Sequence, residues 1–219
     1  MGKSQTGQAL ERLREMVFSG DLPPDSNHYE ADLADQLGMS RTPVREAALT
    51  MQAQGLVEVQ PRRGVRILPI SSEDMADIYD VLCELESLAA QRAAEIGYAK
   101  EDLQVAQDCI DEMDAALSKQ DRNLWAKADD RFHTELVRLG GNKRVVEVVA
   151  RYSDQVRRAR MMTLPLRPLP VKSNEDHRAV LCAIERGDAQ QAKDVHRAHR
   201  VEARTLLTNL IREFGLRRL

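Results

Sequence analysis

The sequence has few aromatic residues, 4% of its 219 positions, and only three cysteines. So few aromatic side chains favour a core of Leu, Ala and Val between helices over a β-sandwich. The cysteines, Cys83, Cys109 and Cys182, are far apart and show no paired spacing, which predicts reduced thiols and no disulfide framework. No apolar run approaches the ~20 residues of a membrane span, and the polar start MGKSQTGQALER is unlike a secretory signal. The sequence therefore predicts a cytoplasmic protein without a membrane segment.

A strong positive charge is also missing, because the formal net charge is −3. This balance excludes indiscriminate attraction to nucleic acid, so any contact with DNA has to come from a local cluster of charge. Such a cluster exists. Residues 1–37 hold three basic and seven acidic side chains, whereas residues 38–70 hold five arginines and two glutamates. The reversal is typical of a DNA-binding footprint.

The first 70 residues predict three helices followed by a β-hairpin. Apolar residues repeat at helical spacing before SGDLPP (19–24) and again before Gly38. Ser40 is the expected N-cap of a third helix, which runs to about Gln54. The short β-type runs LVEV (56–59) and VRIL (65–68) flank the turn QPRRG. We therefore expect a first domain at residues 1–70.

The remainder, residues 71–219, shows only helical patterns. Gly97, Gly140–Gly141, the proline-rich stretch 164–170 and Gly187 mark the breaks. The sequence predicts a mainly α protein whose second domain is an antiparallel all-helical bundle. The expected helices of this domain cover 72–94, 100–118, 121–139, 143–162, 173–186 and 188–214.

Two arginines of the third helix, Arg41 and Arg45, are four residues apart and therefore share one face. Thr42 lies beside them, and the opposite face is apolar. An arginine fork suits guanine edges and phosphates alike. Arg62 and Arg63 occupy the predicted hairpin tip, from which they would reach the DNA backbone or the minor groove. From spacing alone, a solvated helix face and a basic loop explain the same residues.

Residues 37–67, LGMSRTPVREAALTMQAQGLVEVQPRRGVRI, closely resemble the winged helix-turn-helix of the GntR family of transcription regulators. The resemblance implies that Ser40, Arg41, Thr42 and Arg45 contact double-stranded DNA from the recognition helix, and that Arg62, Arg63 and Gly64 do so from the wing. Some members of the family carry a further arginine at the start of the second helix. Ala31 stands at that position here, so the DNA contact of that arginine is not carried over to this sequence. A homodimer would read a palindromic operator, because its two recognition helices share the symmetry of the site.

The second domain places one carboxylate and three imidazoles beside apolar stripes. Asp129 and His133, at i and i+4, lie on one helix face, His177 lies beside Val180 and Ile184, and His199 beside Leu206 and Leu210. A divalent metal would satisfy all four side chains in a bundle interior. Alternatively, each histidine is a hydrogen-bonded core residue. His196 competes with His199, from which it is about 60° away around the helix axis.

Two segments of this domain, DDRFHTEL (129–136) and SNEDHRAVLCAIERGDAQQAKDVHRAH (173–199), resemble the FCD ligand-binding domain of the FadR subfamily. In the second segment Asp176 takes the place of the acid that precedes the histidine. The resemblance implies that Asp129, His133, His177 and His199 bind a divalent transition metal, which is zinc, nickel, iron or manganese. It also implies a small-molecule effector, a carboxylate, near the metal.

One position departs from the FCD pattern. Many members carry an arginine in the first helix of the bundle, where it meets the carboxylate of the effector, and Leu82 stands at that position here. We expect Arg157 or Arg160 to take the role of this arginine, or the effector to be less acidic.

The leading hypothesis is a homodimeric DNA-binding transcription regulator that responds to a small metabolite. Two alternatives remain open from the sequence. A His/His/His/Asp site can activate water in a metal-dependent enzyme, although the nearest further carboxylate, Asp130, points about 100° away from Asp129. The metal could also be purely structural in a constitutive DNA-binding protein.

Overall fold

The computed structural model describes residues 4–214, and its internal contacts divide the chain into two compact units. The first unit holds the residues up to Ser71, together with Arg151–Met162 and the last described residues from Ile211. The second unit holds Ser72–Ala150 and Thr163–Leu210. The predicted domain limits, 1–70 and 71–219, remain a prediction. The first unit differs from the first predicted domain, because two later helical segments cluster with it.

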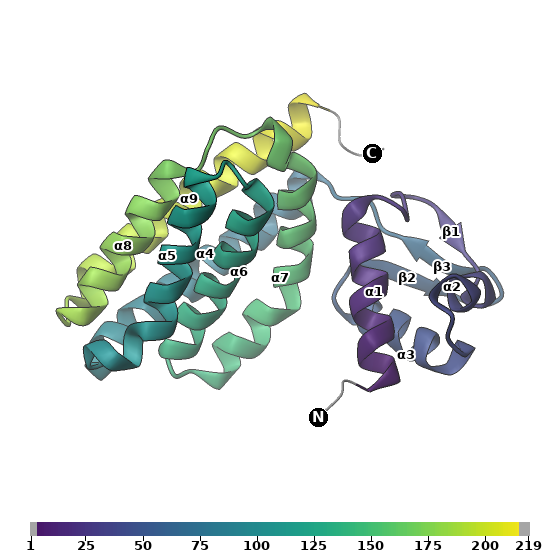
Figure 1. The fold of residues 1–219 in the computed structure, drawn as a ribbon, viewed down its shortest axis with the longest axis horizontal. Coiled ribbons are helices and arrows are strands. Elements are labelled where there is room, and N and C mark those ends of the chain that lie inside the picture. Colours follow the sequence, from purple (N-terminus) through teal and green to yellow (C-terminus); the bar gives the residue numbers. More distant parts are fainter. Residues whose placement is uncertain (1–3, 215–219) are drawn as a thin grey trace. The chain divides into compact units, whose positions relative to one another are not determined.

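The first unit is built from three helices and a small antiparallel sheet with strand order β1-β3-β2 (Figure 1). Helix α3 is its centre, since α1, α2 and β2 all pack against it. Buried aliphatic side chains from all of these elements, among them Leu13, Leu33, Val44 and Val57, form one hydrophobic core. The elements are α1 (Gln5–Ser19), β1 (Asn27–His28), α2 (Glu30–Leu37), α3 (Arg41–Ala53), β2 (Val57–Gln60) and β3 (Gly64–Ile67).

The turn between α2 and α3 is closed by Gly38. Its φ of 64° lies in the left-handed region that glycine adopts without strain, and its N–H bonds the carbonyls of Ala34 and Asp35. Ser40 occupies the N-cap position of α3 as predicted, but its side chain makes no capping hydrogen bond. The hydroxyl of Ser40 is therefore not needed to start the helix.

The wing is the β2–β3 hairpin, with Val57 opposite Ile67 and Gln60 opposite Gly64. Gly64 has a φ of 88°, and a Cβ added there would lie 2.2 Å from the carbonyl oxygen of His28. Only glycine fits this close approach. The partner segment, β1, was not predicted, because a strand of two residues carries no periodic pattern; its pairing with β3 defines it.

The second unit is a helical bundle in which α4 and α5 each pack against both α6 and α8 (Figure 1). The predicted helices are present, and the described chain is mainly α as predicted. Their boundaries lie within two residues of those expected, except that the helix predicted from residue 100 begins as the 3-10 turn η1 and continues as α5 only from Gln104. Within residues 4–214, no helix combines the length and the hydropathy needed to cross a bilayer. The elements are α4 (Ser72–Ile96), η1 (Lys100–Leu103), α5 (Gln104–Ser118), α6 (Arg122–Leu139), α7 (Lys143–Thr163), η2 (Leu164–Leu166), α8 (Val171–Glu185) and α9 (Ala189–Glu213).

Candidate DNA-binding surface and metal centre

Helix α3 presents its polar face to solvent. Arg41, Thr42 and Arg45 are exposed, as is Ser40 just before the helix, while Val44, Ala47, Ala48 and Met51 are buried on the opposite face. The Arg45 side chain is 66% exposed, and its Nε lies 3.9 Å from Glu30 Oε1. An ion pair so long and so exposed contributes little energy. Arg45 can therefore leave Glu30 for another anionic or polar partner at little cost.

The wing presents Arg62 and Arg63 at its tip, and both are exposed. Arg66, which follows on β3, behaves differently: its guanidinium lies 2.8 Å from Asp25 Oδ1 and 3.5 Å from Glu58 Oε2. Arg66 is thus engaged within the fold, whereas the two tip arginines project from it. Gly64 is partly buried against the backbone of His28, so packing alone requires a glycine at that position.

In the second unit, the ring nitrogens of His133, His177 and His199 lie within 4.8 Å of one another. They come from α6, α8 and α9, and all three side chains are buried, His177 completely. The ring centroids of His177 and His199 are 4.7 Å apart. Three helices thus bring together three residues that are up to 66 positions apart in the sequence.

Asp129 lies against two of these histidines. Its Oδ1 is 3.7 Å from His133 Nε2 and 3.5 Å from His177 Nε2. These separations are longer than a usual hydrogen bond. They are close to the ~3.4 Å that separates two ligands of one tetrahedral ion with bonds of ~2.1 Å. The ring nitrogens of the three imidazoles lie within 4.8 Å of one another, and Asp129 lies beside two of them. Three imidazoles and a carboxylate are a donor set that suits a divalent transition metal.

Glu86 of α4 lies behind this cluster, and it was not among the residues predicted from the sequence. Its Oε2 is 3.2 Å from His133 Nδ1 and 3.1 Å from His196 Nε2, and Arg200 Nη2 donates to both of its oxygens at 2.5 Å. Burial raises the pKa of Glu86, but the Arg200 guanidinium and the hydrogen bonds from His133 and His196 outweigh burial and hold the pKa well below its usual range.

This arrangement distinguishes the two nitrogens of His133. A carboxylate 3.2 Å from Nδ1 favours the tautomer with the proton on Nδ1, and Nε2, which lies 3.7 Å from Asp129 Oδ1, is then the nitrogen that a metal would use. Burial lowers the pKa of His133 well below its usual value and that of His196 to about 4. Both rings are therefore neutral at pH 7. For His133, this is the form that a metal ligand requires.

A second group, Glu86, His133 and His196, also brings its donor atoms within 4.8 Å. It fits a cation less well, because the positively charged Arg200 already bonds both oxygens of Glu86. His196, which the sequence placed at the edge of the apolar stripe, is fully buried and pairs with this glutamate. The group that includes His199 is thus the better candidate for a metal site.

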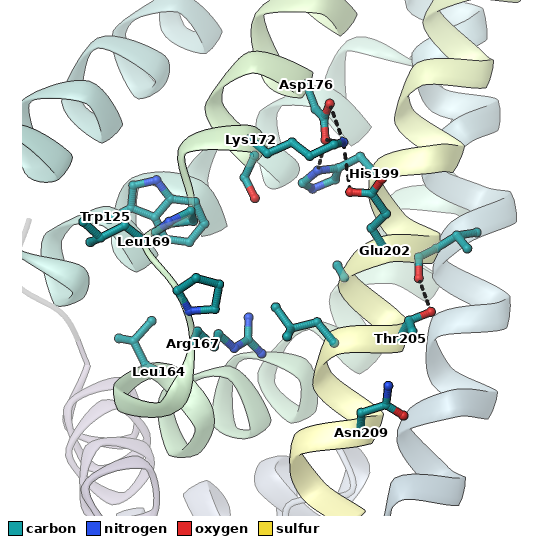
Figure 2. A pocket seen from close by; sticks show the side chains of 16 residues that line it. Trp125, Leu164, Arg167, Leu169, Lys172, Asp176, His199, Glu202, Thr205 and Asn209 are labelled. Carbon is teal, nitrogen blue, oxygen red and sulfur yellow. Dashed lines mark hydrogen bonds and ion pairs between the residues drawn. The ribbon is translucent and has the colours of Figure 1, made fainter.

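His199 connects the cluster to a cavity of about 560 Å³ (Figure 2). Asp176 Oδ2 lies 3.3 Å from His199 Nδ1, and Lys172 contacts the same carboxylate at 3.1 Å. Arg157 and Arg160 are absent from the wall. Both belong to the first unit, where Arg157 lies 5.2 Å from the Phe18 ring centroid. The lining residues are Trp125, Leu164, Arg167–Pro170, Lys172, Ser173, Asp176, His199, Val201–Ala203, Thr205, Leu206 and Asn209.

An exposed arginine-bearing helix with a basic wing, followed by a helical bundle, is the architecture of a winged-helix transcription regulator with a second, helical domain. Two family models match the chain accordingly: bacterial regulatory proteins of the gntR family over residues 5–67, and the FCD domain over residues 77–202. The chain belongs to the gntR family and carries an FCD domain. It is a DNA-binding regulator of transcription and not an enzyme.

Curated relatives agree with this assignment. The chain is 40% identical over 131 residues to an HTH-type transcriptional regulator of Agrobacterium vitis, covering 59% of this chain and 77% of the relative. It is 30% identical over 206 residues to an HTH-type regulator of Streptomyces ambofaciens, covering 90% of this chain and 83% of the relative. Among solved structures, E. coli McbR/YncC is similar in fold, with a TM-score of 0.81, 20% identity, and coverage of 95% of this chain and 99% of that one.

Proposed function

We propose that this regulator acts as a homodimer on a palindromic operator and that a carboxylate metabolite, bound beside a metal in the helical unit, sets its affinity for the operator. One observation carries the proposal. His199 belongs both to the buried histidine cluster and to the wall of the 560 Å³ cavity. A ligand in this cavity would therefore touch a side chain that also faces the metal site.

The DNA-reading residues of the proposal are those exposed on α3 and at the wing. Arg41, Thr42 and Arg45, with Ser40 before them, would enter the major groove, where the first turn of a recognition helix meets base edges. Arg62 and Arg63 would contact phosphates or the minor groove. Gly64 would let the backbone of the wing come close to the DNA.

Asp129, His133, His177 and His199 would hold the ion. Zinc, nickel, iron and manganese all accept this donor set. When bound, the ion supplies a positive charge that attracts an anionic ligand to this end of the cavity. Glu86 and Asp176 orient His133 and His199 from behind through the ring nitrogens that face away from the cluster.

A ligand changes operator affinity only if it binds one arrangement of the two DNA-binding units better than another. Typical coupling free energies are about 1–3 kcal/mol, which correspond to a change in affinity of roughly 5- to 150-fold. We expect the carboxylate to act within this range.

The test is fluorescence anisotropy with a duplex selected from random sequence by the purified protein. A set of carboxylic acids is titrated at saturating metal, and at least one is expected to change the operator Kd by roughly 5-fold or more. His177→Ala should abolish the response and keep basal binding. Arg41→Ala with Arg45→Ala should weaken basal binding itself, by about 1–3 kcal/mol for each arginine that bonds a base bidentately. A Kd that no acid changes contradicts the proposal.

A further inference from the structure

Glu30 is an acidic side chain that stands beside the proposed DNA-reading arginines of the first unit. It opens α2, and its Oε1 lies 3.9 Å from Nε of Arg45 on α3. The other exposed arginines of this surface are Arg41, Arg62 and Arg63, and no acid of the described residues pairs with them. Arg45 therefore differs from them in having a negative charge at its side.

The stability of the fold does not account for this pair. The side chain of Arg45 is 66% exposed and that of Glu30 is 26% exposed, so at 3.9 Å their attraction adds little. An acid in the first turn stabilises a helix through the partial positive charge of its N-terminus, but Asp32 supplies such an acid in the same turn. The place of Glu30 beside a reading arginine therefore calls for another explanation.

The contact with Glu30 involves only one part of the Arg45 guanidinium. Glu30 approaches Nε, the nitrogen nearest the stem of the side chain. The two terminal nitrogens, Nη1 and Nη2, form another edge of the planar group. This terminal edge donates two parallel hydrogen bonds, either to O6 and N7 of a guanine or to two oxygens of a phosphate. By geometry alone, both partners can bind there while Glu30 stays at Nε.

The charge of Glu30 separates these two partners. The edge of a guanine is neutral, whereas a phosphate carries a negative charge that would lie a few ångströms from the Glu30 carboxylate. Like charges at such a distance repel each other even near a protein surface. The next residue, Ala31, stands where some family members carry an arginine, so the start of α2 offers DNA an acid and no base. Phosphate binding is thus disfavoured at this point of the surface.

We propose that Glu30 determines specificity as a positioning residue: it directs the terminal edge of Arg45 to a guanine and repels a phosphate from the same place. This role of Glu30 rests on the part of the proposed function that places Arg45 in the major groove, and it involves neither the metal nor the effector. Unrelated DNA, on which Arg45 would meet phosphates, is bound more weakly as a result. The operator, on which Arg45 meets a base, keeps its affinity.

The test is fluorescence anisotropy on the full-length protein with two duplexes, the operator selected from random sequence and a scrambled duplex of the same length and composition. In Glu30→Gln, the ratio of the scrambled Kd to the operator Kd is expected to fall by roughly 3- to 10-fold, the effect of one pair of like charges near a surface. The fall should come mainly from tighter binding of the scrambled duplex. The slope of log Kd against log salt for this duplex should also steepen by about 0.9, because Arg45 then contacts a phosphate.

Asp32→Asn is the matched control, because it removes the same charge from the same turn of α2, on a side that does not face Glu30. It should change the ratio of the two Kd values by less than about two-fold. Glu30→Asp keeps the charge and should keep most of the discrimination. In a protein that carries Arg45→Ala, adding Glu30→Gln should no longer alter the ratio, because the two side chains act as a pair. The melting temperature of each variant verifies its folding.

Two results would overturn the inference: a folded Glu30→Gln protein with an unchanged ratio, or an equal fall of the ratio in Asp32→Asn. Arg45→Ala alone separates this inference from the proposed function. If Arg45→Ala weakens operator binding while Glu30→Gln leaves the ratio unchanged, only the role of Glu30 is contradicted. If Arg45→Ala binds the operator as the unmodified protein does, the DNA-reading part of the proposed function is contradicted, and the role of Glu30 with it.

Discussion

Glu86 joins the histidine cluster to α9, and it is 1% exposed. Its carboxylate is shared by two imidazoles and one guanidinium, so both of its oxygens are satisfied. A carboxylate behind a metal-binding histidine fixes the orientation of the ring and increases its basicity. We therefore infer that Glu86 is a positioning residue that would act on a bound metal through His133.

The prediction is that Glu86→Gln lowers metal affinity by roughly 10- to 100-fold, the usual effect of losing such a partner. The amide keeps the size of the side chain but removes the charge that holds the proton on His133 Nδ1. Competition with a chromogenic chelator measures the metal affinity. The measurement is made well below the melting temperature, because the buried Arg200 loses its counter-charge in this variant and the fold is destabilised. Glu84→Gln, two residues away on the same helix and 56% exposed, is the control. Equal affinities of the two variants would refute this role.

At the residue scale, part of the site could be predicted from the sequence. Asp129 and His133 share a helix face, and the structure places them side by side. Glu86 also has a signal in the sequence, because it is a charged residue four positions after Leu82, on the largely apolar buried face of α4. The cavity-lining residues of the stretch 164–170 have none, because a proline-rich break has no period from which the direction of a side chain could be read.

At the scale of elements, the wing depends on one backbone conformation. Gly64 begins β3 with a φ of 88° while its Cα lies against the carbonyl of His28. Side chains are strained at such a φ, and here the carbonyl also leaves no room for a Cβ. The hairpin that carries Arg62 and Arg63 can therefore pair with β1 in this way only because residue 64 is a glycine.

Gly64→Ala is expected to destabilise the first unit by more than the ~1–3 kcal/mol of a strained φ, because steric overlap adds to the strain. Gly20→Ala separates the two effects, since Gly20 has nearly the same φ, 87°, but open space where its Cβ would lie. Urea unfolding followed by circular dichroism gives both free energies of unfolding. Equal losses in the two variants would show that the approach to His28 has no energetic effect.

Most elements followed from the sequence, and the exceptions have physical reasons. Amphipathic helices repeat their pattern over many residues, so α4 to α9 could be predicted with their order and approximate ends. The two-residue strand β1 forms only because β3 pairs with it. The stretch 164–170 was predicted as a break, but it contains η2 and supplies part of the cavity wall.

At the scale of the whole molecule, the fold class and the transcription-regulator function were predictable because two local motifs specify them. The convergence of α6, α8 and α9 on one point could not be predicted from hydrophobic periodicity. Periodicity shows which face of a helix is buried, but not which other helix packs against that face. Four of the five histidines of the chain lie in this cluster or beside it, and the fifth, His28, lies in the first unit. The central claim is that the cluster binds one ion in each chain.

Native mass spectrometry of the purified protein, from cells supplied with zinc, nickel, iron and manganese, tests this claim most directly. The account predicts a dimer that carries two transition-metal ions, a loss of both ions in His199→Ala, and full retention in His28→Ala. An unmodified protein that binds no ion under these conditions, or a folded His199→Ala protein that keeps both ions, would contradict it.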